Sequence, residues 1–212
     1  SASVHGELRA LRVFPNGVGW AVGYGTVLQR VPATPSRRFG PKLSFYRQEL
    51  LPNAVGIHGV AFGDVNGDDL DDLYLVSIRD ANHLLRNEGE GQFVDVTGAA
   101  GLMGTVATSP MLRRVAQYCA VWGDYDNDGL LDLFVAGWYG SSSLYRQTPN
   151  HTFVDVTKRL PVDERPISAN SAVFGDVNGD GRLDLFITNE HGSNRLWLND
   201  GSCIRLRPER SN

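Results

Sequence analysis

The sequence predicts an all-β fold: a β-propeller, or part of one, with about four blades of four short strands each. Three observations predict this fold. Acidic segments recur along the chain and align without a gap, short apolar or alternating segments flank them, and turn residues are frequent. The chain has 212 residues, including 24 glycines and 10 prolines, and this composition favours many turns over long helices. Four short strands in a repeat of about 50–60 residues are typical of a propeller blade.

The repeat is centred on three acidic loops. Each copy begins with small apolar residues, continues through the loop and ends in a β-branched or aromatic stretch that reads as a strand. The copies are 59–76, 119–136 and 171–188, and their first aspartates are 60 and then 52 residues apart. The similarity continues beyond the loops, because 82–97 matches 142–157.

These copies divide the chain into four units. The unit 1–57 is a degenerate first blade, or a set of N-terminal strands, without an acidic loop. The units 58–117 and 118–170 each carry a loop, and 98–117 has room for one short helical turn. The unit 171–212 carries the third loop but shows no obvious fourth strand. Propellers usually have about 4–8 blades, so the chain could form a small ring, part of a larger ring, or a segment that other chains complete.

The negative charge of the chain is concentrated in the loops. The net charge is −4, and the segments 64–72, 124–132 and 176–184 hold five, four and three aspartates, which is 12 of the 24 acidic residues. This clustering indicates local binding sites rather than an acidic tail. It disfavours nucleic-acid binding, because the loops would repel a phosphate backbone and the basic residues are scattered. No stretch approaches the ~20 apolar residues of a membrane-spanning helix.

The spacing of oxygen donors within the loops predicts calcium sites. Side-chain oxygens occupy positions one, three, five and nine of each loop, and the backbone carbonyl of position seven can add a further ligand. Several carboxylates with a carbonyl suit Ca²⁺, whereas zinc would favour Cys or His ligands, which the loops lack. We therefore expect up to three Ca²⁺ ions. The predicted ligands are Asp64, Asn66, Asp68, Leu70 and Asp72; Asp124, Asp126, Asp128, Leu130 and Asp132; and Asp176, Asn178, Asp180, Arg182 and Asp184.

The loops differ from an EF-hand and from one another. An EF-hand requires a glutamate at position twelve and flanking helices, but position twelve is Leu75, Val135 or Ile187 and the flanks read as strands. Position six needs a positive φ and is glycine in two loops; in the first loop it is Asp69, so this site is expected to be the most altered. The second loop has four ligand carboxylates and is expected to bind Ca²⁺ most tightly.

A turn without metal is the alternative reading of each loop. An isolated copy of the motif would fit an Asx-turn equally well, and three aligned copies with the same spacing favour a metal site.

The loops carry a family resemblance. Phe-Gly or Trp-Gly followed by D-x-[ND]-x-D-G-x-x-D-L resembles the FG-GAP repeat of the integrin α-subunit head. The segment GDYDNDGLLDLFVAGW, with LYRQ and FVDVT after it, is similar to the bacterial and cartilage-acidic-protein type of this repeat. The resemblance covers about 59–200 and implies a β-propeller with Ca²⁺ on blade loops, usually extracellular and usually serving adhesion or ligand binding. It carries metal ligation only to the three loops.

Three functions remain open at this stage. The first is a non-enzymatic extracellular module that binds a protein or glycan and is stabilised by Ca²⁺. The second is a propeller-fold carbohydrate-active enzyme or lectin; the five histidines show no shared spacing and no hydrolase motif is present. The third is an architectural subunit completed by other chains. Candidate contact residues are Trp138, Tyr139, His191 and Asn194, although packing between blades is the favoured role for the two aromatic residues.

One sequon agrees with a secreted setting, and the two cysteines do not bear on it. Asn150 lies in an N-glycosylation sequon. Cys119 and Cys203 could pair, stay reduced or bond to another chain, and their spacing does not decide between these states. We expect an extracellular or secretory location.

Overall fold

A computed structural model shows the architecture. It describes the strand course at 8–13, 19–23, 26–31, 44–48 and 204–206, and side chains and loops at residues 51, 56–78, 80–103, 117–138, 142–160 and 168–201. Within these ranges the fold is all-β, apart from the three-residue 3₁₀ turn η3 (Thr157–Arg159).

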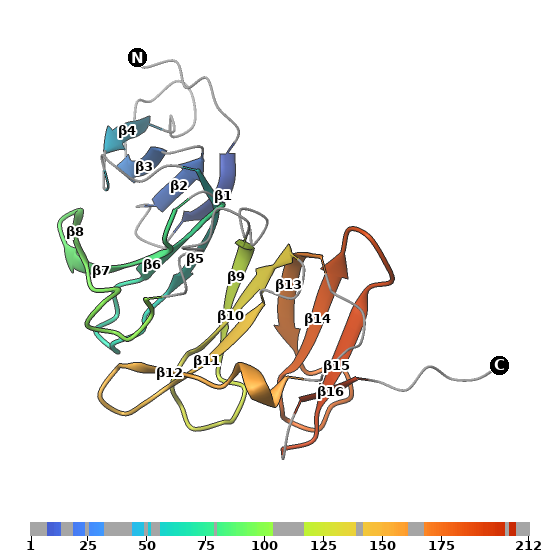
Figure 1. The fold of residues 1–212 in the computed structure, drawn as a ribbon. Coiled ribbons are helices and arrows are strands. Elements are labelled where there is room, and N and C mark those ends of the chain that lie inside the picture. The colour runs from blue at the N-terminus through green and yellow to red at the C-terminus, as the bar shows by residue number, and fades with distance from the viewer. Residues whose placement is uncertain are drawn as a thin grey trace, which may run out of the picture.

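The strands form four antiparallel sheets of four strands, each following the order of the chain (Figure 1). Sheet 1 contains β1 (Leu8–Val13), β2 (Gly19–Gly23), β3 (Thr26–Val31) and β4 (Ser44–Gln48). Sheet 2 contains β5 (Ile57–Gly63), β6 (Asp72–Ser77), β7 (His83–Gly89) and β8 (Gln92–Asp95). Sheet 3 contains β9 (Gln117–Gly123), β10 (Asp132–Gly137), β11 (Ser143–Gln147) and β12 (Phe153–Asp155). Sheet 4 contains β13 (Ala169–Gly175), β14 (Asp184–Asn189), β15 (Arg195–Asn199) and β16 (Ile204–Leu206).

Sheet 4 corrects one expectation from the sequence. The unit 171–212 showed no obvious fourth strand, but β16 pairs with β15, with Leu206 opposite Trp197 and Ile204 opposite Asn199. The strand has three residues, and a segment this short is too brief to display a period-two pattern.

The sheets are stacked face to face through their first strands. β5 contacts β9, β9 contacts β13, and β1 contacts β5. The second strands β6 and β10 are buried along their whole length, which explains why LYLV and LFVA read as continuous apolar runs rather than alternating ones. β10 supplies Leu133 and Val135 to the core shared with sheet 2, and Phe134 and Ala136 to the core shared with sheet 4.

Two apolar cores lie between the described sheets. The core between sheets 2 and 3 includes Tyr74, Leu84, Leu133 and Phe153. The core between sheets 3 and 4 includes Phe134, Leu144, Leu185 and Trp197. Burying a side chain such as Phe134 stabilises the fold by roughly 1.5–3 kcal/mol, so the inter-sheet cores hold the stack together.

The glycine of each Phe-Gly or Trp-Gly pair allows the sheets to approach closely. A Cβ atom on Gly63 would lie 2.8 Å from the ring of Trp122, and one on Gly123 would lie 2.7 Å from the ring of Phe174. Because real Cβ contacts are longer, only glycine leaves room for the aromatic residue of the next sheet. In the described residues, no helix is long and apolar enough to cross a membrane.

Candidate metal centre

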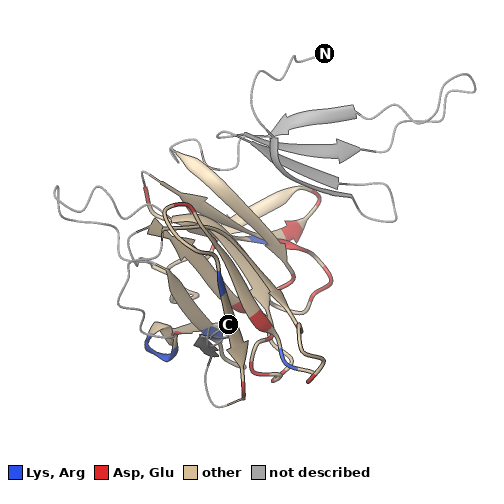
Figure 2. Ribbon diagram, turned by 90° about the vertical axis from the view of Figure 1, so that its right-hand side faces the viewer, with Lys and Arg blue, Asp and Glu red and all other residues tan. Residues whose placement is uncertain are grey.

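The three acidic loops occupy equivalent places in sheets 2, 3 and 4. Each loop joins the first strand of its sheet to the second, and position nine is the first residue of the second strand. Position nine pairs with the glycine that precedes position one: Asp72 with Gly63, Asp132 with Gly123 and Asp184 with Gly175. Figure 2 shows the acidic residues gathered in loops beyond the strand ends, while the strands themselves carry few charges.

The aspartate at position one winds the loop. Its carboxylate accepts hydrogen bonds from the backbone N–H groups of positions five and six, as in an extended Asx-turn. The N–O distances are 3.1 and 2.8 Å at Asp64, 3.0 and 2.9 Å at Asp124, and 3.1 and 2.9 Å at Asp176. The backbone N–H of Gly181, with those of Gly179 and Asp180, holds the pKa of Asp176 below its ordinary value.

Position six has the left-handed backbone conformation that the sequence predicted. The φ angles are 85° at Gly129 and 81° at Gly181, and Asp69 adopts 66°. The prediction that aspartate tolerates this conformation in the first loop is confirmed; the backbone strain of a non-glycine residue remains there.

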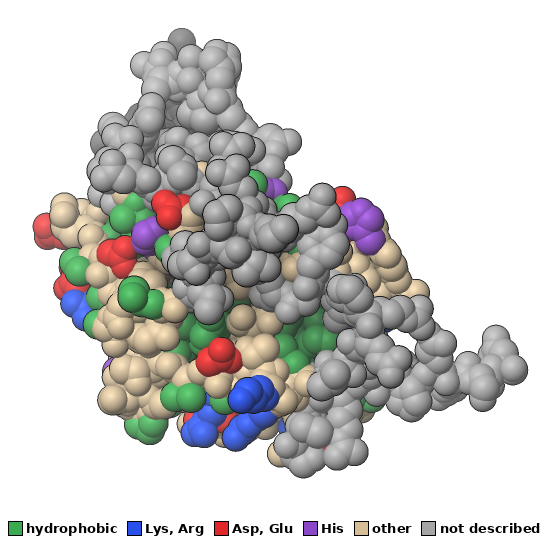
Figure 3. Space-filling model, in the orientation of Figure 1, with side chains coloured by type: hydrophobic (Ala, Val, Ile, Leu, Met, Phe, Trp, Pro, Cys, Tyr) green, Lys and Arg blue, Asp and Glu red, His purple; other side chains and the backbone are tan. Residues whose placement is uncertain are grey.

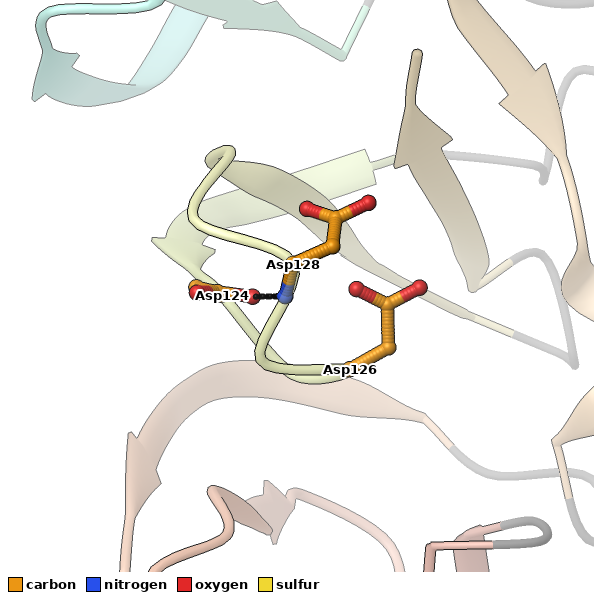
Figure 4. A group of neighbouring side chains, drawn as sticks. All are labelled: Asp124, Asp126 and Asp128. Atoms are coloured by element: carbon orange, nitrogen blue, oxygen red, sulfur yellow. Dashed lines mark hydrogen bonds between the residues drawn. The ribbon is translucent and has the colours of Figure 1, made fainter. Parts of the chain in front are cut away.

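In the second loop, three carboxylates converge (Figure 4). Asp124, Asp126 and Asp128 each offer one oxygen, and these oxygens all lie within 4.8 Å of one another. Burial raises the pKa of Asp126, and the neighbouring charges of Asp128 and Asp124 raise it further. A cation held between these oxygens would offset this repulsion, so the second loop can hold a metal ion.

Position three distinguishes the second loop from the others. Asn66 donates its side-chain N–H to Asp68 over 2.8 Å, and Asn178 donates to Asp180 over 3.0 Å. In the second loop this position is Asp126, which cannot donate when ionised. The first and third loops therefore supply the position-five carboxylate with an amide donor, whereas the second loop places another carboxylate beside it.

A basic side chain that the sequence reasoning missed faces the second loop. The Nε atom of Arg146 lies 2.9 Å from a carboxylate oxygen of Asp126, and its NH2 group lies 3.4 Å from one of Asp128.

The equivalent positions in the other sheets differ. In sheet 2 the equivalent Arg86 pairs with Glu88 instead, at 2.6 Å, and in sheet 4 the equivalent residue is Leu198. In the third loop, Arg182 pairs with Asp180. The sequence did contain a signal for the arginine that faces the second loop, because in two repeats an arginine lies 22 positions after the first aspartate of the loop.

The aspartate at position nine is buried and has both oxygens occupied. One oxygen accepts from the backbone N–H of position two, and the other accepts from a backbone N–H on the third strand. The N–O distances are 3.0 and 2.8 Å at Asp72, 3.1 and 2.8 Å at Asp132, and 3.1 and 2.8 Å at Asp184. All three side chains are at most 1% exposed, so this residue ties the loop to the middle of its sheet.

Burial changes the acidity of two of these aspartates. Desolvation raises the pKa of Asp72 to about 6 and that of Asp132 to about 7, despite the two backbone N–H groups that each carboxylate accepts. A nearby cation stabilises the ionised form of such a buried carboxylate. A Ca²⁺ ion coordinated by the position-nine aspartate, as the sequence predicts, would be such a cation.

An amide side chain on the third strand crosses to the preceding sheet. Gln147 donates its Nε2 group to the carbonyl of Val65 over 2.6 Å, and Asn199 donates its Nδ2 group to the carbonyl of Tyr125 over 2.7 Å. Both acceptors are position two of the preceding acidic loop. Sequence reasoning missed these residues, although a polar residue recurs after LLR, LYR and LWL.

The position-seven residues have an observed role that differs from the predicted one. The backbone N–H groups of Leu70, Leu130 and Arg182 donate to the position-five carboxylates over 2.9, 3.0 and 2.9 Å. Ligation by their carbonyls stays a prediction, as does the full set of five ligands in each loop.

The other candidate contact residues lie away from the loops, because the turn after the second strand is at the opposite end of each sheet. The ring of Trp138 lies 5.1 Å from that of Tyr118 and 5.6 Å from that of His191, which supports a packing role. Asn194 accepts a hydrogen bond from the backbone N–H of Asn189 over 3.0 Å. Tyr139 lies outside the described residues.

The structure also places the sequon and one of the two cysteines. Asn150 is exposed in the turn between β11 and β12, where its side chain accepts a hydrogen bond from Thr152. Cys119 is a partly buried free thiol on β9, and Cys203 lies outside the described residues. Figure 3 shows acidic and basic side chains in small mixed groups, without a broad basic stripe on the described part of that face.

Part of the chain matches a known family of repeats. Residues 124–187 match the model of the FG-GAP-like repeat, and this segment contains the second and third acidic loops. The resemblance predicted from the sequence is confirmed: this part of the chain matches the FG-GAP-like repeat, and the chain is similar to cartilage acidic proteins.

The relatives are cartilage acidic proteins. The chain is similar to cartilage acidic protein 1 of Homo sapiens, with 27% identity over 150 residues, which is 68% of this chain and 21% of the human protein. It is 27% identical to the Mus musculus protein over 146 residues and 25% identical to the Xenopus tropicalis protein over 142 residues. The chain therefore spans about a fifth of the length of the curated relatives it matches.

Proposed function

We propose that the chain is a calcium-stabilised β-propeller module of an extracellular protein, in which the metal is structural and the exposed loops bind a protein or glycan. The observation that carries the proposal is the convergence of Asp124, Asp126 and Asp128 within 4.8 Å, in a loop whose winding is repeated twice more in the chain. The family match supports the propeller architecture, and the similarity to cartilage acidic protein 1 supports the extracellular setting.

The charge balance of the loops favours a divalent cation over a purely structural turn. Each loop gathers carboxylates beside a buried aspartate, and burial raises the pKa of two of those buried aspartates. A bound Ca²⁺ would offset the repulsion between carboxylates and link the loop to the second strand at position nine. Because such a site forms only in the folded chain, its binding energy adds to the free energy of unfolding. In this role the metal performs no catalysis.

Calorimetric titration with Ca²⁺ tests the proposal. We expect up to three binding equivalents, and we expect Asp68→Ala, Asp128→Ala and Asp180→Ala each to remove one of them, because each deletes the position-five carboxylate of one loop. Glu190→Gln is the matched control, since it removes one exposed negative charge outside the loops and should leave the stoichiometry unchanged. Absence of a saturable Ca²⁺ signal, or loss of binding in the control, would contradict the proposal.

A further inference from the structure

Sheets 2 and 3 each have a face that the next sheet covers. On sheet 2 this face carries five apolar side chains that are buried in the core shared with sheet 3: Ala61, Val65, Tyr74, Val76 and Leu84. On sheet 3 the aligned residues pack into the core shared with sheet 4: Val121, Tyr125, Phe134, Ala136 and Leu144. Apolar side chains at these five aligned positions are therefore typical of a face that another sheet covers in this protein.

Among the described residues, no further sheet covers the same face of sheet 4. The aligned residues are Val173, Val177, Phe186, Thr188 and Leu196. Val173 is 56% exposed, Val177 58% and Phe186 37%, whereas Tyr125 and Phe134, the equivalents of Val177 and Phe186, are 7% and 0% exposed. Exposed apolar residues clustered on one sheet face indicate an interaction surface.

Two more specific features of the covered faces also lack a partner on sheet 4. The carbonyls of Val65 and Tyr125 each accept an amide hydrogen bond from the next sheet, and among the described residues no side-chain amide reaches the carbonyl of Val177. Gly63 and Gly123 each lie against an aromatic ring of the next sheet, but a Cβ atom on Gly175 would meet nothing within 4 Å.

We propose that this face of sheet 4 is the docking site of a further four-stranded sheet of the same repeat class. The docking sheet would place the aromatic residue of its own Phe-Gly or Trp-Gly pair against Gly175 and would donate an Asn or Gln amide to the carbonyl of Val177. An unrelated apolar partner would require neither the glycine nor the aligned carbonyl. The two contacts already present in the chain show that a sheet of this class meets all these requirements, and the inference does not depend on metal binding.

Thiol labelling in an extended chain tests the inference. In a background with Cys119→Ser and Cys203→Ser, the probe is Val173→Cys and the matched control is Val154→Cys on β12, which is exposed to a similar extent at 52%. The extended chain adds a second copy of 161–206 after Leu206, so that the appended sheet offers its own Phe174, Trp197 and Asn199. A second extended chain appends 117–160 instead and offers Trp122 and Gln147.

The expected result is selective protection of the probe. In the 212-residue chain, the probe and the control should react with a thiol reagent at similar rates. In an extended chain, the probe should react slower by roughly tenfold or more, because the reagent must reach the thiolate, and the control should be unchanged. Adding Gly175→Ala should reverse the protection.

Two results would overturn the inference. The first is a probe that stays fully reactive in both extended chains, while Val121→Cys, which sheet 4 covers, remains slow and thereby shows that sheets 3 and 4 are intact. The second is protection of the probe in the 212-residue chain that grows with protein concentration, because a second copy of the chain would then be the occupant.

Discussion

Within one acidic loop, the aspartates at positions five and nine have opposite environments. Asp128 lies at the exposed end of the loop, where it shares space with Asp124, Asp126 and the guanidinium of Arg146. Asp132 is 0% exposed, and both its oxygens accept backbone hydrogen bonds. The same residue type in one motif therefore serves two purposes: the exposed carboxylates can bind a cation, whereas the buried carboxylate joins the loop to the third strand of the sheet.

The largest expected effect comes from removing the buried carboxylate. Asp132→Ala leaves the backbone N–H groups of Tyr125 and Gln147 without their acceptor in the protein interior. We expect a loss of about 3 kcal/mol in the free energy of unfolding, because each unsatisfied buried donor costs roughly 1–3 kcal/mol. Urea denaturation in the presence of a chelator measures this loss without a contribution from metal.

Asp128→Ala is the matched variant for that experiment. Without metal it removes an exposed carboxylate that repels its neighbours, so the expected change is below about 1 kcal/mol. Equal losses for Asp132→Ala and Asp128→Ala would show that the two positions do not differ in the way described.

The glycine before the second loop should show the next largest effect. Gly123→Ala places a methyl group against the ring of Phe174, and overpacking of this kind costs about 1–3 kcal/mol. Gly175→Ala is the matched variant on sheet 4, where a Cβ atom meets nothing within 4 Å, and its thermal unfolding should be nearly unchanged. If the two variants lose the same stability, backbone conformation rather than the inter-sheet contact explains the glycine.

The amide that crosses between sheets should contribute less. Gln147→Leu keeps a similar volume but leaves the buried carbonyl of Val65 without its donor, and we expect a loss of about 1–2 kcal/mol in urea denaturation. Gln92→Leu, on the exposed strand β8, provides the control and should be close to neutral. A neutral Gln147→Leu would mean that the crossing hydrogen bond contributes nothing net.

The smallest effect concerns competition between the Arg146 guanidinium and Ca²⁺ for the carboxylates of the second loop. Arg146→Leu copies the residue of sheet 4 and removes the guanidinium from Asp126 and Asp128. Because an exposed ion pair contributes up to about 1 kcal/mol, the Ca²⁺ affinity of the second loop should rise by roughly twofold to fivefold in a calorimetric titration. Weaker Ca²⁺ binding by this variant would indicate that Arg146 supports the site instead of competing for it.

The sequence predicted those features of the fold that short local sequence patterns determine. The alignment of three loops, the continuous apolar runs such as 73–76 and the glycines at position six are all readable within a dozen residues. The four-sheet arrangement followed from their repetition. By contrast, β16 has only three residues, and no local pattern separated it from the end of the chain.

The site was predicted only in outline, because its energetics depend on distant residues. Gln147 and Val65 are 82 positions apart, so their hydrogen bond is visible only once the sheets are stacked. The burial of Asp132, which distinguishes it from Asp128, likewise results from packing against other strands. Arg146 acts on the second loop from two strands away, and the equivalent Arg86 turns to Glu88, so the same residue type in the same repeat position has different partners.

Thermal unfolding of the 212-residue chain, measured with millimolar Ca²⁺ and again with excess chelator, tests whether calcium stabilises the fold. Calcium at a hundred times its dissociation constant adds about 2.7 kcal/mol per site to the free energy of unfolding. We therefore expect a melting temperature that is several degrees higher with Ca²⁺, and a difference that shrinks when the position-five aspartates are replaced together. A melting temperature that chelation leaves unchanged would contradict this expectation.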